Sequence, residues 1–471
     1  MKTMKTIICG AAGRDFHDFL VLYRDDPATE VVAFTAAQIP YITGRRFPAS
    51  LAGPRYPNGI PIHDEDELAR LIARHHVEQV VFAYSDVREE HVAALAGVAI
   101  AAGADFVLPG ARSMLASKKP VIGVGAVRTG CGKSQTTRYL LDLLEQRGLR
   151  GVALRHPMPY DPDLASQAVQ RFASFADLAA ARCTIEEREE YEPYVARGRV
   201  VYAGVDYRAI LARAEAEADV ILWDGGNNDL PLVRPDLYFV LTDPLRPGDT
   251  TRYFPSRAQL RLADVVLIAK SRSASSSAVD DERILISSLA PEADVIATDS
   301  RLTLVGADEA SLAGKRVVVV EDGPTTTHGG MPYGAAILLA RRAGAVIVDP
   351  RPSFVGELRA TLAKYLSIGP LVPAVGYSEQ QRADLSATLG AVDADLILSG
   401  TPIDLAAIAP DPRGRPILSV RYDLEELANE QPLAPILDRF LAARGLFRST
   451  RPPSVTSPAS PPPLKAAAHA A

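Results

Sequence analysis

The sequence predicts an α/β protein built from three doubly wound domains with parallel sheets. Short runs of Val, Ile and Leu recur along the chain, and each precedes a stretch rich in Ala, Leu and Arg. These runs are apolar throughout and do not alternate with polar residues, which is typical of parallel strands covered by helices on both faces. The length of 471 residues is consistent with two to four domains.

The predicted strands follow this pattern over most of the chain. They cover residues 6–10, 31–35, 79–84, 105–110, 121–125, 151–155, 219–226, 237–242, 264–270, 316–323, 345–350 and 395–400. Helical segments between them place consecutive strands in parallel, as in βαβ units.

The first domain, residues 1–118, is predicted to be Rossmann-like. Its first strand leads into Gly10-Ala-Ala-Gly13 and then a helix, a turn that fits a dinucleotide site, a phosphate site or only a tight turn. The second strand is followed by no acidic residue suited to a ribose, so we expect no bound NAD.

Composition excludes several classes of protein. The net charge of −6 gives no reason to expect nucleic acid or an anionic membrane as a partner. No window of about 18 apolar residues indicates a membrane span. The three cysteines, Cys9, Cys131 and Cys183, are far apart, which indicates a reducing compartment. The first apolar run is too short for a signal peptide, so we expect a cytoplasmic protein.

The stretch 123–144, "GVGAVRTGCGKSQTTRYLLDLL", has the features of a phosphate-binding loop between a strand and a helix. Gly130 and Gly132 allow backbone N–H groups to turn towards an anion at a helix N-terminus. Lys133 can reach the β- and γ-phosphates of a nucleotide, and the Ser134 hydroxyl can ligate Mg²⁺. Further residues assigned to the nucleotide are Gly125, Gln135 and Thr136.

The loop departs from the usual pattern because Val127 stands where a glycine is expected. Read backwards from Lys133, the loop instead matches the deviant form Lys-Gly-Gly-x-Gly-Lys-Ser/Thr, with Arg128 in place of the first lysine. An arginine there can stabilise phosphate charge during transfer, so Arg128 is a candidate catalytic residue. Such loops occur in dimer-forming enzymes, and the corresponding residue can act across a subunit interface, so we expect a homodimer.

A P-loop site needs an acidic partner on a neighbouring strand, and "WDGGNND" at 223–229 supplies Asp224. Asp224 ends a predicted strand and is the expected carboxylate partner of Mg²⁺. Asn227 follows in a polar cluster that we assign to the substrate. The Asn-Lys-x-Asp string of guanine-specific enzymes is absent from 269–272, "AKSR", which favours ATP.

The central domain, residues 119–272, is therefore predicted to be P-loop NTPase-like. The third α/β domain, residues 273–448, begins within a Ser-rich segment that fits a linker. Residues 449–471 are rich in Pro, Ser and Ala and are predicted to be a disordered tail.

Several unusual strings together resemble the family of cyclic 2,3-diphosphoglycerate synthetase and its bacterial relatives. They are "VRTGCGKSQTTR" (127–138), "RHPMPY" (155–160), "CTIEEREEYEPY" (183–194), "WDGGNND" (223–229), "TDPLRPGD" (242–249) and "VEDGPTTTHGGMPYGAA" (320–336). The resemblance covers residues 1 to about 448 and departs from the family at "IAKS", where Ile-Asn-Lys is expected. It implies an ATP- and Mg²⁺-dependent enzyme that closes a phosphoanhydride within 2,3-diphosphoglycerate, releasing ADP and phosphate.

A small phosphorylated acid would need cations beside the nucleotide. Arg155, His156 and Arg246 are the candidate anion ligands, and His328 in a Thr-rich loop is another. Glu187 and Glu189 are candidate metal ligands, although such a run of glutamates is usually a solvated helix face. Thr184 with Glu187 also fits a helix capping box.

Two other functions remain open. A nucleotide switch or metallochaperone would use the same loop, but its paired Cys or clustered His are absent. An ATP-dependent ligase for another phosphorylated or carboxylic acid would share every P-loop residue and differ only in its substrate pocket.

Overall fold

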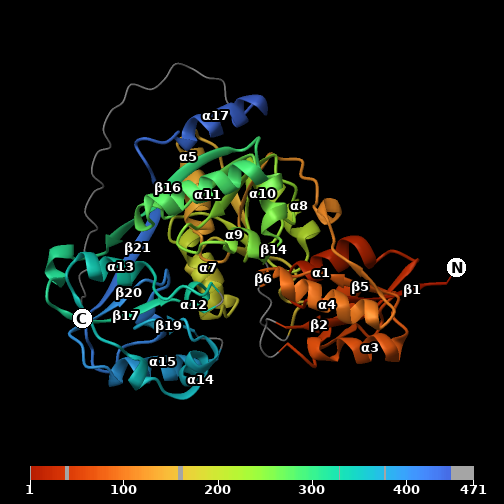
Figure 1. The fold of residues 1–471 in the computed structure, drawn as a ribbon, viewed down its shortest axis with the longest axis horizontal. Coiled ribbons are helices and arrows are strands. Elements are labelled where there is room, and N and C mark those ends of the chain that lie inside the picture. Colours follow the sequence, from red (N-terminus) through yellow and green to blue (C-terminus); the bar gives the residue numbers. More distant parts are fainter. Residues whose placement is uncertain (1, 38–41, 157–162, 328, 376–377, 447–471) are drawn as a thin grey trace. The chain divides into compact units, whose positions relative to one another are not determined.

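The computed structural model of the chain describes residues 2–37, 42–156, 163–327, 329–375 and 378–446 (Figure 1). Contacts divide the chain into two compact units, Met1–Gln431 and Pro432–Ala471. The described part of the second unit contains helix α17 (Leu433–Ala443). Both large sheets belong to the first unit.

The N-terminal sheet has the strand order β3-β4-β2-β1-β5-β7 in the described residues. Its strands are β1 (Met4–Cys9), β2 (Thr29–Ala36), β3 (Arg46–Phe47), β4 (Ile60–Asp64), β5 (Gln79–Phe82) and β7 (Asp105–Val107). All its pairs are parallel except β3 with β4. Its helices are α1 (Arg14–Asp18), α2 (Ala49–Ala52), α3 (Leu68–His75) and α4 (Glu89–Ala101). Apolar clusters pack on both faces of β1, as a doubly wound fold requires.

The second sheet runs through the rest of this unit in the order β10-β11-β9-β12-β8-β13-β15-β16-β21-β20-β17-β18, with β19 also paired to β17. Its first strands are β8 (Val121–Ala126), β9 (Gly151–Arg155), β10 (Gln170–Phe172), β11 (Val201–Ala203), β12 (Val220–Asp224), β13 (Leu237–Thr242) and β15 (Val265–Ile268). The remainder are β16 (Asp294–Leu304), β17 (Arg316–Asp322), β18 (Val346–Ile347), β19 (Val372–Ala374), β20 (Leu396–Ser399) and β21 (Ile417–Glu426).

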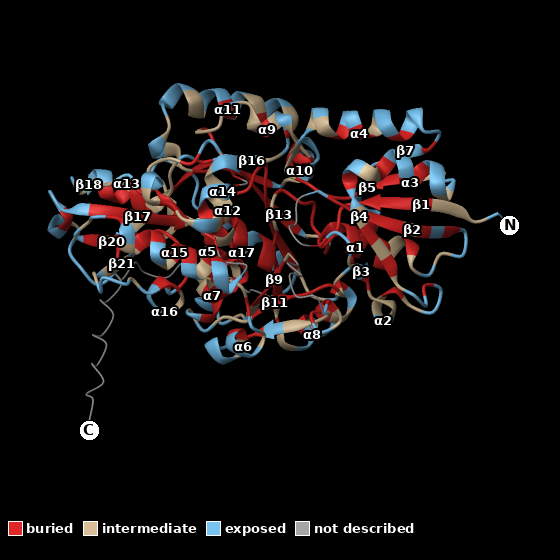
Figure 2. Cartoon of the chain, turned by 90° about the horizontal axis from the view of Figure 1, so that it is seen from below, coloured by how far each residue is buried: buried red, intermediate tan, exposed pale blue. Residues whose placement is uncertain are grey.

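Helices connect these strands and cover the sheet. They are α5 (Lys133–Glu145), α6 (Phe175–Ala180), α7 (Ile185–Val195), α8 (Tyr207–Glu217), α9 (Asp249–Arg252), α10 (Ser256–Leu262), α11 (Ser276–Leu289), α12 (Gly323–Thr326), α13 (Ala335–Arg342), α14 (Gly356–Lys364), α15 (Glu379–Ala391) and α16 (Leu405–Ile408). Figure 2 shows largely buried strands, whereas helices such as α4 and α11 expose one face to solvent.

The predicted α/β class is confirmed, and every predicted strand coincides with an observed one. The predicted boundary at 272/273 falls before β16, which continues the sheet. Residues 294–297 of β16 pair in parallel with β15, and residues 298–304 pair antiparallel with β21. The domain boundaries therefore stay predictions, because a continuous sheet neither requires nor excludes separate domains.

A small ladder joins the two sheet regions. β6 (Val87–Arg88) pairs antiparallel with β14 (Tyr253–Phe254), so a segment following β5 is held beside the segment that follows β13. Within the described residues, no helix combines the length and apolar character needed to cross a bilayer.

Candidate functional site

The phosphate loop lies where the sequence predicts it, between β8 and α5. Gly130 and Gly132 have φ of +79° and +110°, a left-handed backbone that favours glycine. Helix α5 begins at Lys133, which is buried, and Lys133 Nζ donates to Asn227 O over 2.6 Å. Burial, assisted by the nearby Arg155 guanidinium, lowers the pKa of Lys133. An anionic ligand would compensate this charge better than the single carbonyl does.

The other residues assigned to the nucleotide divide into two groups. Ser134 and Gln135 line the cavity described below, and Gln135 Nε2 donates to Ser300 Oγ over 2.8 Å. The Thr136 hydroxyl donates to the Gly132 carbonyl, one turn back in the helix, over 3.0 Å. Gly125 lies inside β8, where an added Cβ would collide with the Tyr238 hydroxyl, so packing alone explains this glycine.

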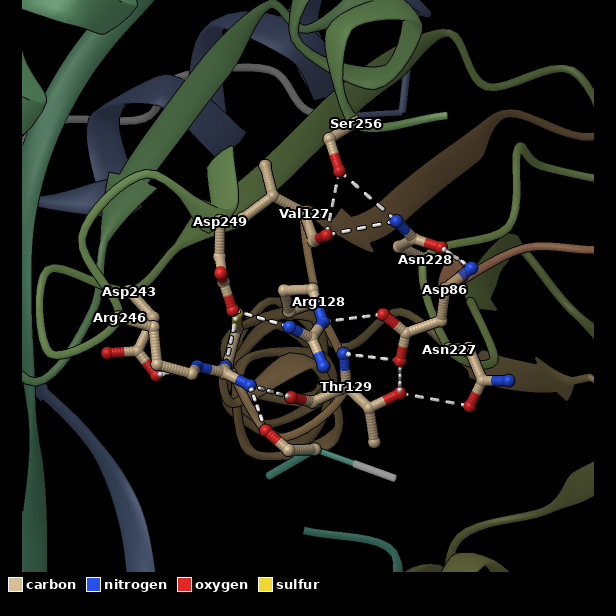
Figure 3. Close-up of polar contacts among 12 residues, drawn as sticks. Asp86, Val127, Arg128, Thr129, Asn227, Asn228, Asp243, Arg246, Asp249 and Ser256 are labelled. Atoms are coloured by element: carbon tan, nitrogen blue, oxygen red, sulfur yellow. Dashed lines mark hydrogen bonds and ion pairs between the residues drawn. The ribbon is translucent and has the colours of Figure 1, made fainter. Parts of the chain in front are cut away.

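Arg128 is enclosed by protein groups (Figure 3). Its Nε donates to Asp86 Oδ1 over 2.6 Å, its Nη1 pairs with Asp249, and its guanidinium carbon lies 3.5 Å from the centre of the Tyr253 ring. Only 4% of the residue is exposed, and it is not among the cavity-lining residues. These contacts of Arg128 are all with residues of the same chain. Its catalytic role and the homodimer inferred from it stay predictions.

Asp86 ties the N-terminal sheet region to the phosphate loop. It has φ of +59°, and its Oδ2 accepts from the Thr129 hydroxyl over 2.6 Å. The same hydroxyl lies 3.0 Å from Asn227 Oδ1, and the Asp86 amide donates to Asn228 Oδ1 over 2.6 Å. Asn227, a predicted substrate ligand, thus lies beside the loop and lines the cavity.

Asp224 lies at the carboxyl end of β12, between the ends of β8 and β9, because all three strands are parallel neighbours. It is fully buried, and its Oδ2 accepts from Tyr194 Oη over 2.5 Å and lies 2.9 Å from Arg155 Nη1. Its Oδ1 has no hydrogen-bond partner among the described residues. An acidic oxygen of this kind, with the Ser134 hydroxyl, fits the demand of Mg²⁺ for oxygen ligands.

Arg155 and Arg246, both proposed as anion ligands, are already bonded. Arg155 Nη1 donates to Gly225 O over 2.8 Å, and Arg155 Nη2 pairs with Glu190. Arg246 donates to the carbonyls of Thr129 and Gly329 over 2.8 and 2.9 Å and pairs with Asp243. Arg155 lines the cavity, whereas Arg246 braces the loop from outside it.

A cavity of about 320 Å³ opens from the phosphate loop. Among the described residues, seven carboxylate side chains line it but only four Lys or Arg side chains. The acidic residues are Asp86, Glu186, Glu189, Glu190, Asp299, Glu321 and Asp322, and the basic ones are Lys133, Arg138, Arg155 and Lys270. Its far wall is formed by α7, the end of β17 and the end of β20, which pairs in parallel with β17.

Glu189 and Asp322 face each other across this far wall. Glu189 Oε1 accepts from Thr401 Oγ1 over 2.6 Å, while its Oε2 has no hydrogen-bond partner among the described residues. Burial and the Asp322 carboxylate raise the pKa of Glu189 well above its usual range. The two acids are therefore close enough for the Asp322 carboxylate to disfavour ionisation of Glu189.

Glu321 is the second buried acid of this wall. Its Oε1 accepts from the amides of Ile337 and Gly334 over 2.8 and 3.2 Å, and Gly334 and Gly400 leave room for its carboxylate. Burial raises its pKa from 4.5 to about 7.

Glu187, the other predicted metal ligand, lies outside the cavity lining. It forms the capping box of α7, where Oε2 accepts from the Thr184 amide over 2.8 Å, as the sequence predicts. No group of three or more His, Cys, Asp or Glu within the described ranges forms a metal site by itself.

His156 follows β9 and separates the main cavity from a smaller one. Its Nδ1 lies 3.1 Å from Asp229 Oδ2, and burial lowers its pKa. His328, the remaining predicted substrate ligand, lies outside the described residues.

Comparison with known proteins identifies the family. The chain is 53% identical to arginine synthetase ArcE of Thermococcus kodakarensis over 429 residues, which cover 90% of this chain and 94% of that protein. The chain belongs to the arginine synthetase ArcE family. No protein-family model matches it.

Solved structures that resemble this ArcE-family chain are distant. LpxK of Aquifex aeolicus, crystallised with ATP, is 15% identical, with 69% of this chain and 90% of that chain covered and a TM-score of 0.38. Cobyrinic acid a,c-diamide synthase of Mycobacterium smegmatis, with an ATP analogue and magnesium, is also 15% identical. It covers 53% of this chain and 91% of that chain with a TM-score of 0.18.

The sequence of this ArcE-family chain did not reveal several residues of the site. Lys270 donates to Gly130 O over 2.7 Å and lines the cavity. In the sequence, its string "AKSR" shows only that the Asn and Asp of guanine-specific enzymes are absent, and it gives no sign of this contact. Asp322 stands in the string "VEDG" and could have been selected as a polar residue at a strand end. Asp86 carries no local signal, because its role depends on contacts with residues more than 40 positions away.

Proposed function

We propose that this chain is an ATP-dependent synthetase that forms arginine from its ureido analogue. Replacing one terminal nitrogen of a guanidinium group by oxygen gives the ureido group of citrulline. To convert it back, the oxygen must become a leaving group, and transfer of the γ-phosphoryl group of ATP to that oxygen provides one. A nitrogen nucleophile then forms the new carbon–nitrogen bond, and phosphate departs with the oxygen.

The phosphate loop supports the first half of this reaction. Lys133 and the amides of the loop would hold the phosphates, and Lys270, which is paired with Asp243, supports the loop at Gly130. Ser134 and Asp224 would hold Mg²⁺, which when bound neutralises charge on the phosphates. The surrounding protein then contributes positioning and fixed electrostatics.

The observation that carries the proposal is the acidic far wall of the cavity. A guanidinium cation pairs with carboxylates through charge-assisted hydrogen bonds. Glu189, with its unpartnered Oε2, and Asp322 are the residues that we assign to this cation. The ArcE relative, whose name specifies arginine as its product, supports the same assignment.

Formation of cyclic 2,3-diphosphoglycerate is the second candidate, favoured by the sequence strings that resemble that family. Its substrate carries two phosphates and a carboxylate, so it needs cations that are not already paired. Among the cations that line the cavity, Arg155 is paired with Asp224 and Glu190, and Lys270 is paired with Asp243. This charge distribution ranks the candidate below arginine formation.

The test measures ADP release by the purified chain with ATP and Mg²⁺ in the presence of either acceptor. Citrulline with an ammonium salt is predicted to stimulate ADP release and to yield arginine, detected by mass spectrometry. Phosphoanhydride signals in phosphorus NMR with 2,3-diphosphoglycerate, and no arginine from citrulline, would instead establish the second candidate. Lys133→Ala provides the background rate in both assays.

A further inference from the structure

A second, smaller cavity adjoins the main one. It measures about 50 Å³ and shares Ala12, His156 and Asn227 with the main cavity. Its other walls come from the Gly10–Asp15 turn after β1, from the segment after β5, and from Asp229. Exposed Ala37 lies at its edge, so it borders solvent on the side of the N-terminal sheet. Such a volume admits only a molecule of a few heavy atoms.

The Gly10–Asp15 turn does not offer an anion site to this cavity. Asp15 already occupies the turn, because its carboxylate accepts from the amides of Ala12, Gly13 and Phe16 over 2.9, 3.2 and 2.7 Å. The chain's own carboxylate thus stands where the phosphate of a bound nucleotide would be expected.

The charges around the cavity favour a small cation. Asp229 is 4% exposed, and its carboxylate lines the cavity together with that of Asp15. Arg14 also borders the cavity, but its guanidinium donates to Leu230 O and Ser113 Oγ, each over 3.0 Å. The Arg14 guanidinium and the Asp15 carboxylate are therefore both bonded to other groups, which leaves Asp229 as the acidic side chain beside His156 in the cavity lining.

His156 connects this cavity to the main one. His156 Nδ1 lies 3.1 Å from Asp229 Oδ2 but makes no hydrogen bond to a described residue, and burial lowers the pKa of the ring, which favours the neutral imidazole. A Cβ placed on Gly13 would lie 3.1 Å from His156 Nε2, so this nitrogen faces the turn that lines the small cavity.

We propose that the small cavity is the subsite for the nitrogen nucleophile, binding ammonium between Asp229, His156 and the Gly10–Asp15 turn. This inference rests on the proposed function. Ammonium donates a hydrogen bond to His156 Nε2 and loses one proton to solvent at the open edge of the cavity, and the resulting ammonia attacks the activated ureido carbon in the main cavity. The carbon–nitrogen bond forms, the carbon–oxygen bond breaks, and phosphate leaves with its electron pair. The N-terminal sheet region thereby supplies one wall of the reaction site.

The test compares KM values for ammonium, citrulline and ATP in two variants that alter the small cavity differently. Asp229→Asn removes the charge and keeps the shape. Gly13→Ala keeps every charge and adds a methyl group whose carbon would lie 3.1 Å from the His156 ring. Each variant is predicted to raise the KM for ammonium about tenfold or more, Asp229→Asn through loss of a charge-assisted contact and Gly13→Ala through the space that its methyl group takes from the ligand. The KM for ATP and for citrulline should change less than threefold.

Glu78→Gln, an exposed carboxylate of the same sheet region, serves as the matched control and should leave all three constants unchanged. Thermal unfolding midpoints show whether each variant is folded. If Asp229→Asn does not fold, the ammonium KM of Gly13→Ala tests the subsite by itself. An unchanged ammonium KM in a folded variant, with wild-type turnover intact, would overturn the subsite alone. Absence of ammonium-dependent arginine formation by the wild type would remove the proposed function and the subsite together.

Discussion

The two walls of the main cavity differ in how the chain builds them. The phosphate wall comes from one continuous stretch, β8, its loop and the first turn of α5, with Lys270 added from β15. The far wall combines α7, the end of β17 and the end of β20, which are more than 100 residues apart in places. The first wall is basic and its chemistry can be read from a local motif. The second is acidic and takes shape only in the folded chain, and we propose that this wall selects the substrate.

The largest effect is expected on the phosphate wall. Lys133→Ala should slow turnover about 1000-fold, because a preorganised cation facing the transferred phosphoryl group is lost. The fold should persist, because burying the Lys133 ammonium group costs free energy and its removal relieves that cost. ADP release measures the loss, and Lys118→Ala, a solvent-exposed lysine, is the control. A loss smaller than tenfold would mean that phosphate is held elsewhere.

The buried Glu321 of the far wall should make the free energy of unfolding depend on pH. Because the pKa of Glu321 is about 7 in the folded chain and 4.5 ordinarily, the folded state holds its proton more tightly. The contribution of Glu321 to stability should therefore be fully present below pH 4.5 and fall by about 3 kcal/mol as pH rises to 7. Urea unfolding at pH 5 and pH 8 should show a smaller difference for Glu321→Gln than for the wild type. An equal difference in both proteins would show that Glu321 titrates normally.

Two glutamates on α7 allow a matched comparison within the far wall. Glu189→Gln should raise the KM for arginine, measured in the reverse direction as ATP formation from ADP and phosphate, by about 10- to 100-fold. Glu187→Gln keeps the capping box and should leave that KM within about twofold. The sequence pattern assigns both glutamates to a metal ion. A rise in the Mg²⁺ requirement for either variant, with no change in the arginine KM, would support the metal-ligand interpretation.

The smallest effect is expected at Arg128, behind the phosphate wall. Arg128→Lys keeps the charge but loses the planar guanidinium group, which bonds Asp86 and Asp249 through different nitrogens and stacks on Tyr253 (Figure 3). It should cost about 1 kcal/mol of stability and raise the KM for ATP a few-fold. Steady-state kinetics with ATP checks this. Turnover slowed by about two orders of magnitude or more, at unchanged KM, would instead place Arg128 on the phosphates.

The same contrast explains what the sequence could and could not predict. The strands, the phosphate loop at Lys133, the acid at Asp224 and the capping box at Thr184 all follow from local patterns of residues. The pairing of Arg155 with Glu190, and the meeting of Glu189 with Asp322, depend on which distant segments the sheet order places together. A cation that looks available in the sequence can therefore be paired in the fold, as Arg155 is with Glu190.

The most direct test follows the ureido oxygen. Citrulline labelled with ¹⁸O at that oxygen is incubated with the chain, ATP, Mg²⁺ and ammonium, and the released phosphate is analysed by mass spectrometry. Phosphoryl transfer to the acceptor oxygen predicts one ¹⁸O atom in the phosphate for every arginine formed. Unlabelled phosphate accompanying arginine formation would contradict the account, because the oxygen would then have left by a route that the phosphate loop does not activate.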